Sequence, residues 1–178
     1  MTSLQYRPWV QTTLAPGNPD NGHGGLTLDV LGGGDPTSGS GAITGTSALA
    51  VAFVDTTSGY TFSAAHQWVS DLGANVVAGG IATGTGGDDR GELQNVRFVN
   101  AGTAGVAVDA NDFTVTGMGD GTQSVNALAL YFLISNSGDE NPLLAYIDTG
   151  TGFGFTPFSS TVTVTWDSGT NRIFSVGA

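Results

Sequence analysis

The triplet Asp148-Thr149-Gly150 is the part of the sequence whose residue types could perform acid–base chemistry. It closes the run LLAYIDTGTGF, residues 143–153, and an apolar run leading into Asp-Thr-Gly is typical of the catalytic loop of an aspartic protease. That chemistry needs two carboxylates that share a proton, and the triplet occurs only once in the sequence. A homodimer could supply the second carboxylate, but the sequence ends at residue 178, which leaves too few residues for a retroviral-type flap and its following strands. We therefore interpret the triplet as a strand that ends in an Asx-type turn.

The other residues that often carry chemistry are sparse. His23 and His66 are the only histidines, and the chain has no Cys, so thiolate sites and disulfides are excluded. Carboxylates could complete a zinc site, but we expect each histidine to be structural or exposed. The sequence has neither a Gly-x-Ser-x-Gly elbow nor a phosphate-binding glycine loop with Lys. We therefore predict no enzyme activity, no catalytic residue, no cofactor and no metal.

Three acidic segments could offer oxygen ligands to Ca²⁺: residues 86–92, 109–112 and 138–141. None of them matches the twelve-residue calcium loop or a tandem glycine-rich nonapeptide. We expect them to be solvated turns.

The charge of the chain excludes two classes of partner. Fifteen acidic residues face four arginines and no lysine, and the net charge of −11 repels phosphate backbones and anionic membranes. No apolar run is long enough to cross a bilayer, and the first residues do not resemble a signal peptide. We expect a soluble protein that binds neither nucleic acid nor membranes.

The elements that must position these residues are predicted to be strands. The sequence contains 29 Gly, and only 11% of its residues are charged, a composition that favours short strands joined by turns over helices. Apolar runs bounded by Gly, Asn and Asp predict strands at 25–31, 48–54, 75–82, 93–99, 105–110, 112–116, 125–135, 143–148, 161–166 and 172–176. This number of short strands indicates an all-β, mainly antiparallel domain of the β-sandwich or jelly-roll-like type.

Three segments have a periodicity that predicts their surroundings. Residues 125–134 are apolar on both faces, so this strand should be central and covered on both sides. Residues 161–166 alternate Thr with apolar residues, which predicts one wet face. One short helix is expected after Ser63, with Ala65, Trp68, Val69 and Leu72 on one face and Gly73 as its C-terminal cap.

The first 46 residues differ in composition from the remainder. They are rich in Pro and Gly, which predicts an extended N-terminal arm and a glycine-rich linker at 1–46, followed by the β-domain at 47–178. The arm carries Tyr6, Arg7, Trp9 and Val10, and Tyr, Arg and Trp are residue types that anchor protein interfaces. We predict that these residues bind a partner; the alternative, that the arm folds back on its own domain, stays open.

Four segments resemble small virion structural proteins of tailed bacteriophages. They are FSAAHQWVSDL (62–72), VDANDFTV (108–115), ALALYFLISNSGDENPLLAYIDTG (127–150) and TVTVTWDSGTNRIF (161–174). The resemblance rests on the order and spacing of the motifs and covers about residues 48–178. The motif positions are His66, Ser70 and Asp71; Asp109, Ala110 and Asp112; Leu130 and Tyr131; Pro142 to Asp148; and Thr163 to Trp166.

The resemblance implies a virion component without enzyme activity. We expect a decoration or cement protein on the outer surface of the phage head, assembled in the host cytoplasm and bound to the major capsid protein or another virion subunit. A homo-oligomer is expected, with a trimer favoured. Two alternatives remain: a tail, connector or fibre module of the virion, and a carbohydrate-binding adhesin domain.

Overall fold

The computed structural model describes residues 3–5, 41–42, 48–80, 93, 96–100, 106–133, 141–167 and 173–176. All of its strand pairs are antiparallel, which confirms the all-β prediction. The described elements are β1 (Ser3–Gln5), β2 (Gly41–Ala42), β3 (Ala48–Val54), the 3₁₀ helix η1 (Val69–Asn75), β4 (Arg97–Asn100), β5 (Val106–Asp109), β6 (Phe113–Asp120), β7 (Ala127–Leu133), β8 (Leu143–Ile147), β9 (Phe158–Val164) and β10 (Phe174–Val176).

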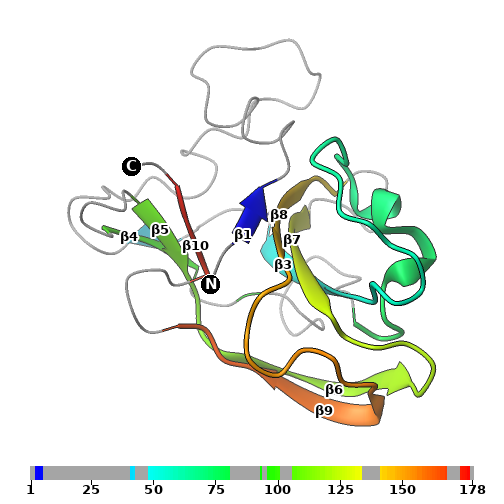
Figure 1. Ribbon diagram of the computed structural model, residues 1–178. Helices are drawn as coiled ribbons and strands as arrows, with labels where there is room; N and C mark the ends of the chain where they lie inside the picture. Colours follow the sequence, from blue (N-terminus) through cyan, green and yellow to red (C-terminus); the bar gives the residue numbers. More distant parts are fainter. Residues whose placement is uncertain are drawn as a thin grey trace.

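The central sheet, sheet A, has the strand order β1-β8-β7-β3 (Figure 1). β3 and β7 pair over their full lengths, from Ala48 opposite Leu133 to Val54 opposite Ala127. β8 pairs with the other side of β7, with a register shift between Leu130 and Tyr131. The short β1 lies along the outer edge of β8.

β7 is central and buried on both faces, as its sequence predicts. One face packs Leu128, Leu130 and Phe132 into a core that also contains residues of β3, β5, β6 and β8. The opposite face packs Ala127, Ala129 and Tyr131 into a second core. This second core is completed by residues between β3 and η1 and by η1 itself, which covers that side of sheet A (Figure 1).

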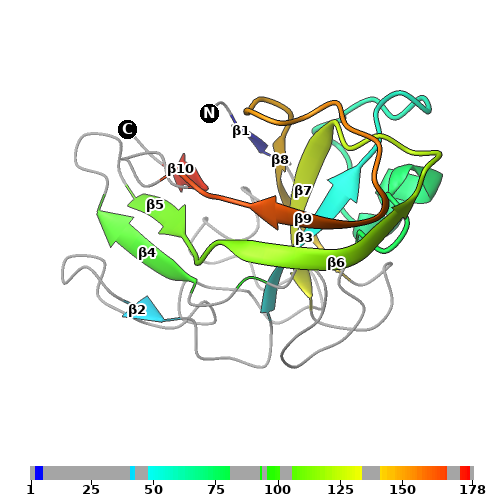
Figure 2. The ribbon, with the colours of Figure 1, turned by 90° about the horizontal axis from the view of Figure 1, so that it is seen from below.

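The remaining strands form two smaller sheets. Sheet B has the order β10-β5-β4-β2, and β6 with β9 forms a two-stranded ribbon that crosses one face of sheet A (Figure 2). Only residues 110–112 separate β5 from β6, and their partners β10 and β9 are likewise successive strands of the chain. Val115 and Met118 of the ribbon reach the same core as Phe53 and Leu130 of sheet A, so the two layers pack face to face in a sandwich-like manner.

The ribbon has one wet face, as the alternation of residues 161–166 predicts. Val162 and Val164 are half-buried against the core, whereas Thr161 and Thr163 are exposed. The Thr163 hydroxyl lies 3.0 Å from the Thr114 hydroxyl on the neighbouring strand. Near the end of the ribbon a Cβ on Gly119 would lie 2.2 Å from the carbonyl oxygen of Pro157, so only glycine permits this approach of the two strands.

The helix differs from its predicted position. Ser63 begins only a turn, in which its hydroxyl accepts a hydrogen bond from the Ala65 N–H, and η1 starts six residues later at Val69. Gly73 lies inside η1 at φ 57° rather than at its C-terminal cap, because the chain kinks there. The predicted face is kept in part, since Val69 and Leu72 are buried.

Two further strand predictions fall on segments that the structure describes in part or not at all. Within residues 75–80 no strand forms, and Val76 makes only an isolated bridge to Val54. The predicted strand at 25–31 lies outside the described residues. β1 and β2 both fall within the segment that we assign to the arm, and the boundary at residue 47 stays a prediction. Among the described residues, no helix has the length and hydropathy needed to span a bilayer.

Candidate functional site

The predicted partner-binding residues Tyr6, Arg7, Trp9 and Val10 lie outside the described residues. They follow directly after β1, whose last residue, Gln5, is opposite Ala145 of β8. The predicted partner-binding residues therefore begin in the sequence directly after the strand at the edge of sheet A.

Two motif carboxylates support the backbone. The Asp71 carboxylate accepts hydrogen bonds from the N–H groups of Gln67 and Trp68, at 2.7 and 3.0 Å. The Asp112 carboxylate accepts one from the Trp166 N–H at 2.9 Å. This bond lies just beyond the last ribbon pair, Phe113 with Val164. It joins the two segments that connect the ribbon to sheet B. Both carboxylates therefore hold local backbone geometry.

His66 and three aromatic rings, those of Tyr60, Phe62 and Tyr146, form a group on the side of sheet A opposite the ribbon. The Tyr60 hydroxyl lies 3.1 Å from His66 Nδ1, and the Tyr60 ring packs against Tyr146 with centroids 5.9 Å apart. Phe62 stacks on Tyr146 at 5.0 Å. Burial, together with the neighbouring Tyr60 and Asp148, raises the pKa of Tyr146 to about 12. His66 is half-buried and partnered, in agreement with a structural histidine.

Asp55 is a buried carboxylate that directly follows β3. Thr57 donates to it from its N–H at 2.7 Å and from its hydroxyl at 2.6 Å, and the Ser58 hydroxyl donates at 2.8 Å. Burial alone raises the pKa of Asp55, but these hydrogen bonds outweigh it and hold the pKa below its usual value. The group thus closes a turn as an ionised carboxylate.

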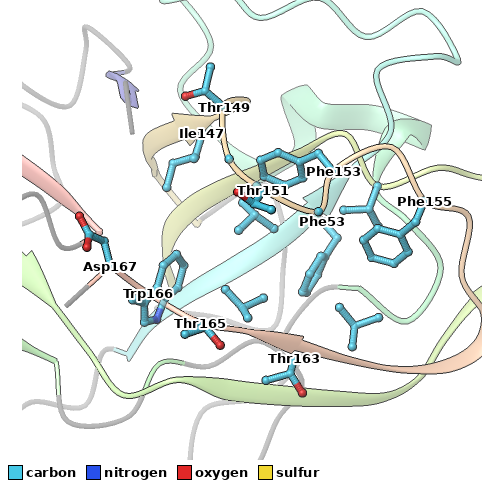
Figure 3. A pocket seen from close by; sticks show the side chains of 16 residues that line it. Phe53, Ile147, Thr149, Thr151, Phe153, Phe155, Thr163, Thr165, Trp166 and Asp167 are labelled. Carbon is cyan, nitrogen blue, oxygen red and sulfur yellow. The ribbon is translucent and has the colours of Figure 1, made fainter. Parts of the chain in front are cut away.

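The described surface is hollowed between sheet A, the loop after β8 and strand β9 (Figure 3). We call this the β9 hollow; its volume is about 300 Å³. Phe53, Phe153 and Phe155 lie on one side of it, and Trp166 and Ile147 lie on the other (Figure 3). The Asp-Thr-Gly segment borders this hollow through Thr149 and Gly150, whereas Asp148 is exposed and is not among the lining residues.

The loop at residues 149–155 forms one wall because backbone hydrogen bonds attach it to Val125, two residues before β7. Val125 donates its N–H to the Phe155 carbonyl at 2.8 Å, and its own carbonyl accepts from the Gly154 N–H at 2.7 Å. Gly152 and Gly154 have φ values of 99° and 89°, a region that favours glycine. The sequence GTGFGF therefore turns back on itself and directs Phe153 and Phe155 along the wall of the hollow.

Trp166 forms the opposite wall. Its side chain is only 6% exposed, and its ring lies 5.9 Å from Phe113, centroid to centroid. Its Nε1–H is buried and has no hydrogen-bond acceptor among the described residues. An unsatisfied buried donor opposes folding by about 1–3 kcal/mol, so the packing of the indole must outweigh that cost.

The lining of the β9 hollow is mostly apolar and includes one carboxylate. Among its described lining residues only Asp167 is ionisable, and the others are aromatic, aliphatic, Thr or Gly. Across the described part of the chain, no group of three or more His, Cys, Asp or Glu side chains could hold a metal ion. Such a lining suits non-covalent binding of an uncharged group.

Comparison of the chain with protein-family models, with curated proteins and with solved structures gave no match.

Sequence reasoning did not find the β9 hollow. Its walls come from four separate stretches, around Phe53, Val125, residues 147–155 and residues 162–167. The available signal was the segment GTGFGF, in which two Phe alternate with Gly directly after an apolar strand. That pattern predicts a tight, apolar loop, but it does not indicate which strand the loop faces.

Proposed function

We propose that the chain is a non-enzymatic structural protein of a tailed-bacteriophage virion, and that it acts as a decoration or cement protein on the outside of the head. The observation that carries this proposal is the structural role of the motif carboxylates Asp71 and Asp112. Each is a position on which the resemblance to phage virion proteins rests, and each accepts backbone hydrogen bonds. Motif residues that hold the backbone in place support a protein family whose members share a fold rather than a catalytic activity.

The distribution of charge and the position of the arm support the outer surface of the head. A net charge of −11 disfavours contact with packaged DNA. β1 lies on the edge of sheet A, and Tyr6, Arg7, Trp9 and Val10 follow it in the sequence. In this proposal these four residues contact the major capsid protein or a neighbouring copy within a homo-oligomer, for which a trimer is favoured. Several weak contacts on a lattice then add up to stable binding.

Immunogold electron microscopy tests the location. An antibody raised against the purified chain should label the heads of intact phage particles from the source culture. Label on tails or fibres would favour the tail, connector or fibre alternative instead. Particles that carry no label, while the antibody detects the chain elsewhere in the lysate, would contradict a virion role.

A binding assay with capsids tests the contact residues. The full chain should co-sediment with capsid shells that lack it, and Trp9→Ala should reduce the bound fraction several-fold. Phe158→Ala is the matched control, because Phe158 is an exposed ring, at 73%, on the β-domain. Equal loss in both variants would show that the arm has no special role in docking.

The carbohydrate-binding alternative has weaker support. Sugars stack on exposed aromatic faces, and among the described residues Phe158 is one such ring, at 73% exposure, but it lies outside the β9 hollow, whose rings Trp166, Phe153 and Phe155 are buried or half-buried.

A further inference from the structure

The β9 hollow leaves apolar surface in contact with water. Phe153, Phe155, Val162 and Val164 all line it, and each is only half-buried although it packs against the main core. Removal of such surface from water is favourable in proportion to its area. A ligand that enters the hollow would therefore gain from four residues at once.

The volume of the hollow sets the size of that ligand. At about 300 Å³, the hollow lies at the lower end of the range for small-molecule pockets. An apolar cavity of roughly 150 Å³ accommodates one benzene ring. The hollow thus has room for about two fused rings.

The lining residues determine the chemical class of the ligand. Rings stand on both sides, but Phe53 and Trp166 are almost fully buried at 1% and 6% exposure, so the ring surface open to a ligand comes from the half-buried Phe153 and Phe155 (Figure 3). A planar aromatic ligand can make offset and edge contacts with these two rings. An anion would lose hydration against this lining and would be repelled by the net charge of −11. A cation would also lose hydration against this lining, in which the exposed Asp167 is the one described ionisable residue, so the lining favours a neutral molecule.

The walls are held in place before anything binds. The loop that carries Phe153 is attached at Val125 by the two backbone hydrogen bonds described above, and the Ser124 and Thr156 hydroxyls lie 2.7 Å apart beside them. A wall that is already ordered reduces the entropy lost on binding.

We infer that the β9 hollow is a binding site for a small, neutral, aromatic molecule of about two fused rings. The site does not depend on the proposed virion role, because all of its residues lie within the β-domain. Indole is a suitable probe, since it is neutral, bicyclic and free of any attached chain.

The test follows the backbone amides of the ¹⁵N-labelled full chain by NMR during titration with indole. We expect saturable shifts at Thr151, Gly152, Phe153 and Val164. Indole-3-acetate, an anion of similar shape, should bind at least fivefold more weakly, and glucose should leave these amides unshifted.

Two variants of adjacent residues on β9 locate the site. Val162→Phe places a ring in the hollow and should weaken indole binding at least tenfold. Thr161→Phe adds the same ring to the exposed face of the strand and should leave the affinity within twofold of the parent. If Val162→Phe does not fold, Phe153→Ser removes one wall ring and should weaken binding at least fivefold.

Three results would overturn the inference. The first is the absence of saturation up to the solubility limit of indole. The second is an unchanged affinity in whichever of Val162→Phe and Phe153→Ser folds. The third is that glucose shifts these amides whereas indole does not.

Discussion

At the scale of single residues, Asp55 and Asp120 offer a matched pair. Each carboxylate accepts hydrogen bonds from the N–H and the hydroxyl of a Thr two residues later, Thr57 and Thr122. Hydrogen bonds lower the pKa of both groups, in Asp55 against the opposing effect of burial. They differ in exposure, because Asp55 is buried and Asp120 is at the surface. The pair therefore separates the effect of the turn from the effect of burial.

We predict that Asp55→Asn lowers the free energy of unfolding at pH 7 by about 1.5–3 kcal/mol, the usual worth of hydrogen bonds to a charged group. The folded pKa of Asp55 lies below that of an unfolded Asp, 3.8, so its stabilising contribution is present above that pH. The contribution is lost as the pH falls through the lower folded value. Urea titrations from pH 7 to pH 2 should therefore show parent and variant converging in acid.

The control for this prediction is Asp120→Asn, which should be less damaging because water solvates the exposed turn. An equal loss of stability in both variants would show that burial of Asp55 is unimportant. Parent and Asp55→Asn curves that stay parallel down to pH 2 would contradict the lowered pKa.

Tyr146 gives a prediction in alkali. Its pKa of about 12 means that the fold holds the protonated phenol, so its contribution to stability is present below pH 10 and is lost as the pH rises towards 12. A stopped-flow pH jump, read as tyrosinate absorbance before the chain unfolds, should show a step near pH 12. Tyr146→Phe should remove that step, and an unchanged titration would assign it to another tyrosine.

At the scale of elements, β7 should be the most sensitive strand. Leu130 and Phe132 are 0% and 1% exposed, and sheet A is covered on both sides, so a cavity there cannot easily collapse. We predict that Leu130→Ala and Phe132→Ala each cost about 2–5 kcal/mol in denaturant titrations. Val164→Ala on the half-wet β9 should cost less, and the reverse order would contradict the central position of β7.

Sequence patterns predicted β3, β7 and β9 because the alternation of apolar and polar side chains reflects what covers each face of a strand. β3 matches its predicted range, residues 48–54, and the wet face of β9 follows from its Thr residues. The helix was misplaced because Asp71 holds the preceding turn through Gln67 and Trp68, a contact that periodicity does not report. The β9 hollow was missed for the same reason, since its walls meet only in three dimensions.

At the scale of the whole molecule, the described strands of the N-terminal segment, β1 and β2, occupy only sheet edges. β1 has β8 as its one neighbour and β2 has β4 as its one neighbour, so removal of either leaves the remaining strand pairs in place. We predict that a chain beginning at Ser47 keeps its β circular-dichroism spectrum and a cooperative melt, at a lower Tm, while it loses binding to capsids. Loss of the cooperative melt would show that the domain boundary at residue 47 is wrong.

The edge positions of β1 and β10 have a mechanical consequence. β1 and β10, the first and last described strands, have three residues each and occupy outer edges of sheets A and B, whereas β3 and β7 pair over seven residues. A load applied to the two ends of the chain therefore reaches these three-residue ladders before the seven-residue one. An optical trap should record small ruptures at low force before one large rupture, so that tension on the ends is relieved at the edges while the central layer stays intact.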